Sequence, residues 1–249
     1  MKNKIAHAKS YPFPSPDHSF LYANGRTEAL TGSKFDRTGR TPVLAAGSNQ
    51  SPEQIHRKYG DMTGEVVIPA QRGRLHDFDV VYAAHLTAYG SVPATFQLSP
   101  GTVVDVFVLW LTAPQLMRMH ETERNYTYDR LSGLRLELDD AGKVADAGAD
   151  EVMDEVMDEV FAYSSRFGCL NHAGDCVGIR EISAQGRRFP ALGQVAALEI
   201  VRDRFAPGTP VDDFIHQHLA ERQVHRDRST RLGEDALPLA YPRVTLESF

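Results

Sequence analysis

The sequence has little that would place it outside the ordinary globular proteins. It holds two cysteines in 249 residues, too few for a disulfide scaffold. No apolar run approaches the roughly 18 residues of a membrane span, since Asp105 interrupts the longest stretch, 103–111. Residues 1–15 carry positive charge but lack the apolar segment of a secretory signal. We therefore expect a cytoplasmic protein with no membrane partner.

Basic residues are also in short supply. Lysine and arginine number 27 against 33 aspartate and glutamate residues, so the net charge is −6. Nucleic-acid binders usually display a basic face, and we expect no nucleic-acid partner. Arginine and histidine gather between residues 216 and 231, but acidic residues are interspersed, and this pattern is typical of a solvated helix face.

What is present is enough apolar sequence for a core and an irregular order of elements. Hydrophobic residues make up 42% of the chain and charged residues 24%. The expected order is strand, helix, several strands, helix, more strands and terminal helices, which is not a regular βαβ alternation. We predict an α+β fold with a small mixed β-barrel-like sheet and surrounding helices. We divide the chain into an N-terminal extension (1–40), a domain (41–205) and a C-terminal helical extension (206–249), and predict no oligomeric state.

The most informative local pattern follows the first forty residues. A short apolar run, 43–46, suits a buried strand, and a tight Gly-Ser-Asn turn follows at 47–49. A helix is expected from Pro52, with Ser51 and Gln54 forming a capping box. The N–H groups of such a turn suit a carboxylate or an oxyanion. A purely structural turn is the alternative interpretation.

Periodicity and turn residues predict the other elements. Turns are expected at 74–78 and at 99–101, which reads Ser-Pro-Gly. A helix is expected over 113–122, where Thr112 and Gln115 form a second capping box. The remaining expected elements are strands over 65–69, 80–82, 103–111, 134–138 and 160–163 and helices over 194–205 and 211–223.

A four-residue repeat, Glu-Val-Met-Asp, occupies residues 151–158. On a helix this spacing would stack like residues on one face, but it would also stack acidic residues that repel each other. We interpret the repeat as an acidic insertion in a hairpin, with a protein-docking face as the alternative.

An acidic pair lies at the end of the helix expected over 113–122. Glu121 and Glu123 are two residues apart, which is a rotation of about 200° on a helix, so both cannot point into one pocket. One of them is a candidate acid or base. Since most glutamates are exposed, a solvated pair is the alternative.

Taken in order, these motifs resemble the γ-glutamylcyclotransferase-like family. The resemblance covers residues 42–165 and depends on five features in sequence. These are the turn 47–49 after an apolar strand, the turn 99–101, the apolar strand 106–109, the Thr-Ala-Pro-Gln-Leu helix start with its acidic pair, and Tyr128 followed by Arg130.

The resemblance implies roles for particular residues. It makes Glu123 the catalytic residue and leaves Tyr126 as an alternative to Tyr128 for the family's downstream tyrosine. The implied substrate-binding residues are Ala46, Gly47, Ser48, Asn49 and Tyr128.

Two positions depart from the family pattern. Ala46 stands where the family has a tyrosine, which removes an aromatic wall from the expected pocket. Arg124 stands where the family has a glycine, and it brings a positive charge beside the acid. The backbone donors of the turn are unaffected, because every residue except proline carries an N–H.

The implied chemistry is a cyclisation. The α-amine of a γ-glutamyl amine or amide attacks its own γ-carbonyl, which releases an amine and leaves 5-oxoproline. The α-amine is an ammonium at neutral pH, so a carboxylate, here Glu123, must take its proton and pass it to the leaving amine. The turn N–H groups would hold the substrate carboxylate or the oxyanion, with the Asn49 side chain as an added donor. This reaction requires no metal and no organic cofactor.

Two other interpretations stay open. Cys169, His172 and Cys176 could supply zinc ligands or a thiol nucleophile with its base, although a turn that closes a hairpin is the simpler explanation. The second is a non-catalytic ligand-binding module of the same fold, which Ala46 and Arg124 both favour.

Overall fold

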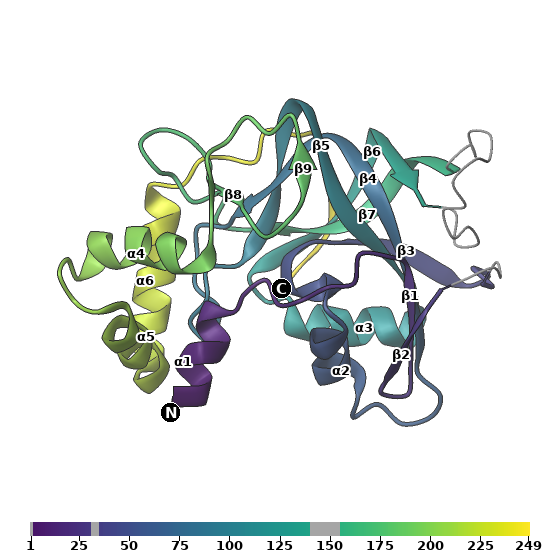
Figure 1. Ribbon diagram of the computed structural model, residues 1–249, viewed down its shortest axis with the longest axis horizontal. Helices are drawn as coiled ribbons and strands as arrows, with labels where there is room; N and C mark the ends of the chain where they lie inside the picture. Colours follow the sequence, from purple (N-terminus) through teal and green to yellow (C-terminus); the bar gives the residue numbers. More distant parts are fainter. Residues whose placement is uncertain (1, 31–34, 140–154) are drawn as a thin grey trace.

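The computed structural model describes residues 2–30, 35–139 and 155–249 (Figure 1). The helices are α1 (Lys2–Lys9), α2 (Pro52–Tyr59), α3 (Ala113–Thr122), α4 (Gln194–Phe205), α5 (Val211–Ala220) and α6 (Arg222–Glu234), with a 3₁₀ turn, η1, at Gly47–Gln50. The strands are β1 (Phe20–Ala23), β2 (Arg26–Ala29), β3 (Arg40–Ala45), β4 (Val67–Tyr82), β5 (Ala94–Thr112), β6 (Tyr126–Leu138), β7 (Glu155–Ser165), β8 (Gly178–Ile179), β9 (Ala184–Gln185), β10 (Ala191–Leu192) and β11 (Val244–Ser248).

Five strands close into a small barrel. Their order is β4–β5–β3–β7–β6, and β6 pairs back onto β4 through Gly73–Leu75 and Leu136–Leu138. The β3–β7 pair is parallel, whereas the other four barrel pairs are antiparallel. The predicted α+β fold with a mixed barrel-like sheet and surrounding helices is therefore confirmed.

Two predicted turns are bulges inside long strands. The 74–78 segment lies within β4 and the 99–101 segment within β5, so neither ends a strand. Asp77 and Gly101 both have positive φ, and the Gly101 N–H donates to Asp77 Oδ1 at 2.7 Å. The register between the strands shifts at this point. The turn-forming residues thus bend a continuous β-ribbon, which a closed barrel needs.

The apolar runs lie in strands that are buried on both faces. Leu44 packs in the larger core inside the barrel, whereas its neighbours Val43 and Ala45 pack in a second core on the outer face. Ile55 of α2 and Met119 of α3 complete this second core. Alternation along a strand explains why one run serves both cores.

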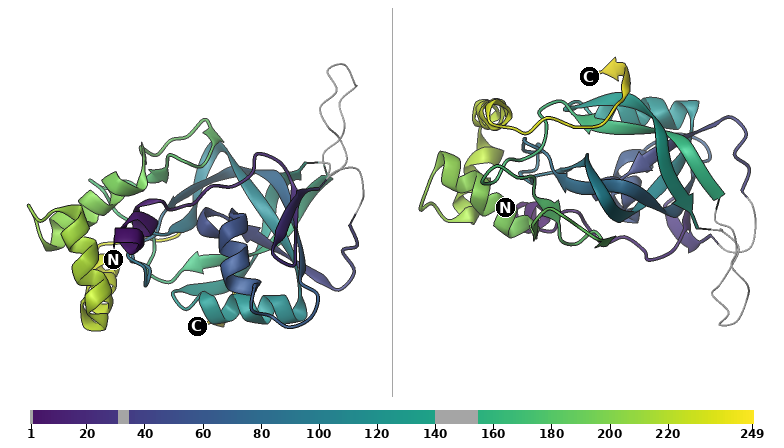
Figure 2. Two further views of the ribbon diagram at one scale, coloured as in Figure 1. Left: turned by 60° about the horizontal axis from the view of Figure 1, so that its bottom comes forward. Right: turned by 90° about the horizontal axis from the view of Figure 1, so that it is seen from above.

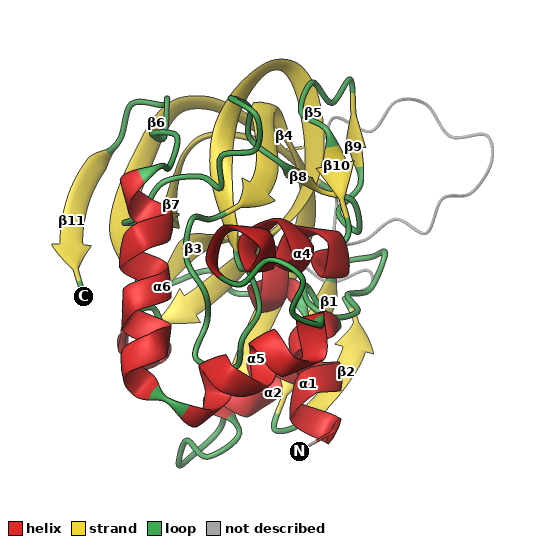
Figure 3. Ribbon diagram, turned by 90° about the vertical axis from the view of Figure 1, so that its left-hand side faces the viewer, coloured by secondary structure: helices red, strands yellow, loops and turns green. Residues whose placement is uncertain are grey.

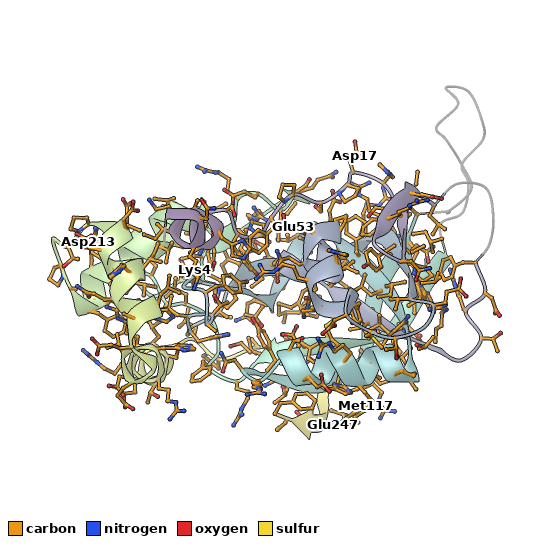
Figure 4. All side chains as sticks on the ribbon, turned by 90° about the horizontal axis from the view of Figure 1, so that it is seen from below. Lys4, Asp17, Glu53, Met117, Asp213 and Glu247 are labelled. Carbon is orange, nitrogen blue, oxygen red and sulfur yellow. The ribbon has the colours of Figure 1, made fainter. Side chains whose placement is uncertain are left out.

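Helices α2 and α3 lie against each other beside the barrel (Figure 4, where Glu53 and Met117 mark them). Arg118 of α3 joins them, since its Nε donates to the Lys58 carbonyl at 2.7 Å. The predicted helix over 113–122 is confirmed, as is its cap, in which the Thr112 N–H donates to Gln115 Oε1 at 2.9 Å.

The other helices gather at the opposite end of the molecule. Figure 2 shows α1, α4, α5 and α6 together, away from α2 and α3, and Figure 3 shows α4–α6 in front of the strands. The prediction of α4 is confirmed at both ends, but α6 begins where α5 was expected to continue. The expected solvated face is wrong for Arg228, which is buried over the Phe214 ring at 3.7 Å and donates to the Phe214 carbonyl.

Both flanking segments add strands to the barrel sheet. β1 pairs with β4, and β11 pairs with β6. The boundaries at residues 40 and 205 stay a prediction, because contact between segments does not decide which part folds alone. Within the described residues, no helix is long and apolar enough to cross a membrane.

The acidic repeat falls largely outside the described residues, which omit 140–154. Its second copy, 155–158, begins strand β7 and pairs with β6 across the hairpin. The expected start of this strand at residue 160 is therefore too late, because strand pairing continues into the repeat.

Candidate functional site

A cavity of about 1060 Å³ lies between the barrel and the terminal helices. Its walls come from the η1 turn, α2, the end of α3, the loop before β5 and the facing sides of α5 and α6. Four of the predicted site residues line this cavity, namely Ala46, Ser48, Asn49 and Glu123. Gly47 and Tyr128 are not among the residues that line it.

Gly47 is the residue that lets the chain turn into η1. Its φ of 61° lies in the left-handed region. A Cβ at this position would overlap the Tyr11 hydroxyl oxygen and would lie 2.8 Å from the Ala94 Cβ. The turn is therefore specified both by its backbone angle and by a close approach of the N-terminal segment.

We expect Gly47→Ala to lower the free energy of unfolding by about 2 kcal/mol, because it combines left-handed strain with a steric clash. Gly133→Ala is the matched control. Gly133 also has positive φ, at 72°, but a Cβ added there would have nothing within 4 Å, so it tests strain alone at about 1 kcal/mol. Urea unfolding of both variants checks the difference, and equal losses would contradict the clash.

Glu123 is a buried carboxylate at the end of α3. Its residue exposure is 8%, and its Oε1 accepts a hydrogen bond from Asn49 Nδ2 at 3.1 Å and an ion-pair contact from the Lys58 ammonium. Glu121 lies at the rim, where its side chain is 62% exposed and pairs with Arg118. The two acids of the pair thus occupy different environments.

The Asn49 side chain differs from its expected use. Its amide nitrogen holds Glu123, so it orients the acid instead of standing free for a substrate oxygen. Its Oδ1 is buried and has no hydrogen-bond partner among the described residues. A buried acceptor without a partner is uncommon in folded proteins, and this one lies beside the hydrogen bond that holds the acid.

Lys58 is the site residue that sequence reasoning missed. It lies one helical turn after Gln54 on α2, and both side chains line the cavity. The expected Ser51–Gln54 capping box is wrong, since Ser51 Oγ and Gln54 Nε2 are both buried without a partner in the described structure. The i, i+4 spacing of Gln54 and Lys58 was the available signal for a shared face.

Three tyrosines form an aromatic wall that Ala46 does not provide. Tyr11, Tyr89 and Tyr126 line the cavity from three separate segments. The Ala94 N–H donates to the Tyr11 hydroxyl oxygen at 2.7 Å, and the Tyr126 hydroxyl donates to the Ala94 carbonyl at 3.0 Å. Burial raises the pKa of Tyr89 to about 12 and raises those of the other two well above the usual value. All three hydroxyls therefore stay protonated at neutral pH.

Tyr128 does not reach the cavity. Strand alternation places it on the same face of β6 as Tyr126, but one residue pair further along. There its ring stacks on the Phe161 ring and contacts the His120 ring edge to face, within the second core on the outer face of the barrel. Tyr126, the alternative that the sequence left open, is the tyrosine of this strand that lines the cavity.

Two buried histidines border the far part of the cavity. Burial lowers the pKa of His85 to about 3 and that of His218 to about 4, so both are neutral at neutral pH. An unfolded histidine titrates near 6.5. The unfolded chain therefore binds more protons below that pH, and stability falls as the solution is acidified.

We expect His85→Phe to flatten this acid loss of stability. The wild-type contribution of His85 is fully present above pH 6.5 and is lost as the pH falls toward about 3. The loss is about 1.4 kcal/mol per pH unit for one such histidine. Denaturant unfolding at several pH values between about 4.5 and about 7.5, on both sides of the pKa of an unfolded histidine, measures this loss. Exposed His172 serves as the control, and an equal flattening in His172→Gln would refute the assignment.

The Cys169–Cys176 segment forms a hairpin turn. Both thiols are buried, whereas His172 is exposed on the turn. The backbone N–H of His172 donates to the Asp175 carbonyl at 2.8 Å. His172 therefore faces solvent while the thiols face the core. Among the described residues, no three histidine, cysteine or acidic side chains gather as a metal-binding group.

No family model matches the chain, and no curated protein does. A solved structure named γ-glutamyl cyclotransferase is similar over 81% of this chain and 90% of its own, with 14% identity and a TM-score of 0.37. A solution structure of a protein from Arabidopsis thaliana is similar over 53% of this chain and 72% of its own, with 18% identity and a TM-score of 0.35. The name of the first structure is that of the family which the sequence motifs resemble.

Proposed function

We propose that this protein cleaves a γ-glutamyl amine or amide by cyclotransfer, releasing 5-oxoproline and the free amine. The observation that supports the proposal is a buried carboxylate, Glu123, held by Asn49 at the wall of a large cavity. The cavity also takes part of its wall from the η1 turn, where the Ser48 N–H donates to the Tyr11 hydroxyl oxygen.

The reaction moves two protons from the ring-forming nitrogen to the leaving nitrogen. The Glu123 carboxylate takes a proton from the substrate α-ammonium, and the freed amine attacks the γ-carbonyl carbon to form the ring C–N bond. The carbonyl oxygen becomes an oxyanion, which the Tyr11 hydroxyl can stabilise, since its oxygen accepts from the Ala94 N–H and its proton is left to donate. The protonated Glu123 gives its proton to the departing nitrogen as the original amide C–N bond breaks. The ring nitrogen then loses its surplus proton to the Glu123 carboxylate, which passes it to the released amine, so that the amine leaves as an ammonium and Glu123 is again a carboxylate.

Lys58 fits this scheme as the partner of the acid before substrate arrives. Its ammonium contacts the same Glu123 oxygen that Asn49 holds. A substrate ammonium carries the same charge and hydrogen-bond donors, so it can replace Lys58 at that oxygen. Folding the substrate back on itself in the cavity then turns ring closure into a positioned, unimolecular step.

The test is direct. The protein is incubated with a mixture of γ-glutamyl amines and amides, and 5-oxoproline is measured beside the Glu123→Gln variant. We expect 5-oxoproline from the wild type alone. Release that persists in the variant would remove Glu123 from its proposed role.

The second candidate is a ligand-binding module without turnover. It is favoured by the Lys58–Glu123 ion pair, since the acid is already neutralised inside the protein, and by Arg124 at the cavity wall. Saturable binding of a γ-glutamyl compound, with no 5-oxoproline from any acceptor, would support this candidate over the enzyme.

A further inference from the structure

The cavity is larger than its proposed reaction needs. Small-molecule pockets span roughly 300–1,000 Å³, and this cavity reaches about 1060 Å³, whereas a γ-glutamyl group is small. The part of the cavity beyond Tyr126, which we name the outer compartment, is lined by His85, Phe167, His218, His225, Arg226 and Ser229. His85 joins the two parts, because its ring lies 5.3 Å from Tyr126 and 5.3 Å from Phe167.

The inner wall of the outer compartment is polar. His218 Nε2 donates to the Thr87 carbonyl at 2.8 Å, and His225 Nε2 donates to the Leu86 carbonyl at 3.0 Å. Because carbonyls only accept, each ring carries a proton on Nε2, and His218, whose pKa burial lowers to about 4, leaves its Nδ1 as an acceptor at neutral pH. His218 is 3% exposed, and its Nδ1 has no hydrogen-bond partner in the described part of the chain. His218 is thus a polar but neutral part of this wall.

The mouth of the cavity is positively charged. Arg226 of α6 and Arg124, just beyond α3, both line the cavity with exposed side chains. Neither makes a hydrogen bond or an ion pair with any residue in the ranges described. The acids nearby are already engaged, since Glu121 pairs with Arg118 and Glu123 with Lys58. Two guanidinium groups are therefore available to an incoming ligand.

We propose that the outer compartment receives the leaving amine, and that Arg226 and Arg124 select an amine whose far end carries an anionic group. This inference rests on the proposed function for its first half, because the outer compartment is the space left once the γ-glutamyl group lies against Glu123. A guanidinium binds a carboxylate through paired, charge-assisted hydrogen bonds, whereas it repels an ammonium. The leaving group is thus recognised by residues of the terminal helices, away from the reacting carbonyl.

Three γ-glutamyl compounds of matched length test the selection. Their amine parts are δ-aminovalerate, its neutral primary amide and cadaverine, which end in a carboxylate, an amide and an ammonium. Binding to the Glu123→Gln protein is measured by calorimetry, and wild-type kcat/KM is measured from 5-oxoproline release. We expect the carboxylate compound to bind on the order of tenfold more tightly than the amide, and the ammonium compound to bind most weakly.

Two arginine variants locate the effect. In the Glu123→Gln background, Arg226→Gln is expected to remove most of the tenfold preference, because it weakens binding of the carboxylate compound much more than binding of the amide compound. Arg188→Gln is the matched control, because Arg188 is exposed, lies outside the cavity and has no partner in the described structure. It changes the net charge equally, so the preference should persist.

The outcomes separate this inference from the proposed function. Charge-selective binding without any turnover would support the compartment and count against the enzyme. Equal binding of the three compounds, or a preference that survives Arg226→Gln together with Arg124→Gln, would overturn the inference even if 5-oxoproline is formed.

Discussion

Glu123→Gln is expected to lower the release of 5-oxoproline by about 10²–10⁴-fold, the contribution of a positioned general acid and base. Glutamine has nearly the same shape and keeps an oxygen that can accept from Asn49 Nδ2, so the geometry seen at 3.1 Å can persist. What it loses is the ability to hold the α-ammonium proton between the two steps. Initial rates with saturating substrate measure the loss, and thermal unfolding of the same sample checks that the variant is folded.

Glu121→Gln is the control for this variant. Glu121 lies two residues earlier on the chain, and its side chain is 62% exposed and paired with Arg118 at the surface. An exposed pair of this kind contributes little to stability, so the free energy of unfolding should change by less than about 1 kcal/mol. The rate should stay within a factor of about two of the wild-type rate, since the roughly 1.4 kcal/mol that corresponds to tenfold is not involved. Comparable losses in the two variants would mean that the effect is not specific to the buried acid.

The elements that the sequence predicted well are those with local causes. Helix 113–122 begins with the Thr112–Gln115 cap, a contact across three residues that is legible in the chain. Helix 194–205 was predicted to the residue because Gly193 precedes it and Pro207 follows two residues after its end. The apolar run at 43–46 was correctly assigned to a strand, although its last residue, Ala46, caps the η1 turn.

The errors came where distant segments decide the structure. Turn residues at 99–101 were assigned to a strand end because a sequence cannot show that Asp77 lies opposite and accepts the Gly101 N–H. Register also decided between Tyr126 and Tyr128, since both have the same alternation and only the depth along β6 separates them. The 216–231 segment was read as a solvated helix face, but helix α6 was not bounded as a separate helix, and its Arg228 and Ser229 are buried.

The candidate site mixes both kinds of information. Glu123 and the 47–49 turn were found from local motifs, and the barrel brings them to hydrogen-bond distance. Tyr11 and Lys58 carried no motif, because their position follows from how the N-terminal segment and α2 pack on the turn. A local pattern can thus identify the acid, while its surroundings require the closed fold.

Those surroundings make Lys58 the second residue with a large expected effect. Lys58→Met is expected to lower the free energy of unfolding at neutral pH by about 3–5 kcal/mol, as for a buried ion pair that loses one partner. The Lys58 side chain is 16% exposed and that of Glu123 10%, so water replaces little of the lost interaction. Methionine retains the apolar stem, which keeps packing changes small.

A double-mutant cycle with Glu123→Gln identifies the cause. The neutral glutamine needs no cation, so Lys58→Met in that background should cost less than about 1 kcal/mol, and the difference between the two costs is the pair interaction. Arg57→Met, at an exposed neighbour on the same helix, should change stability by less than about 0.5 kcal/mol. If Lys58→Met were equally destabilising with and without the Glu123 charge, its contribution would come from packing against Met119, and the carboxylate would need no internal counter-ion.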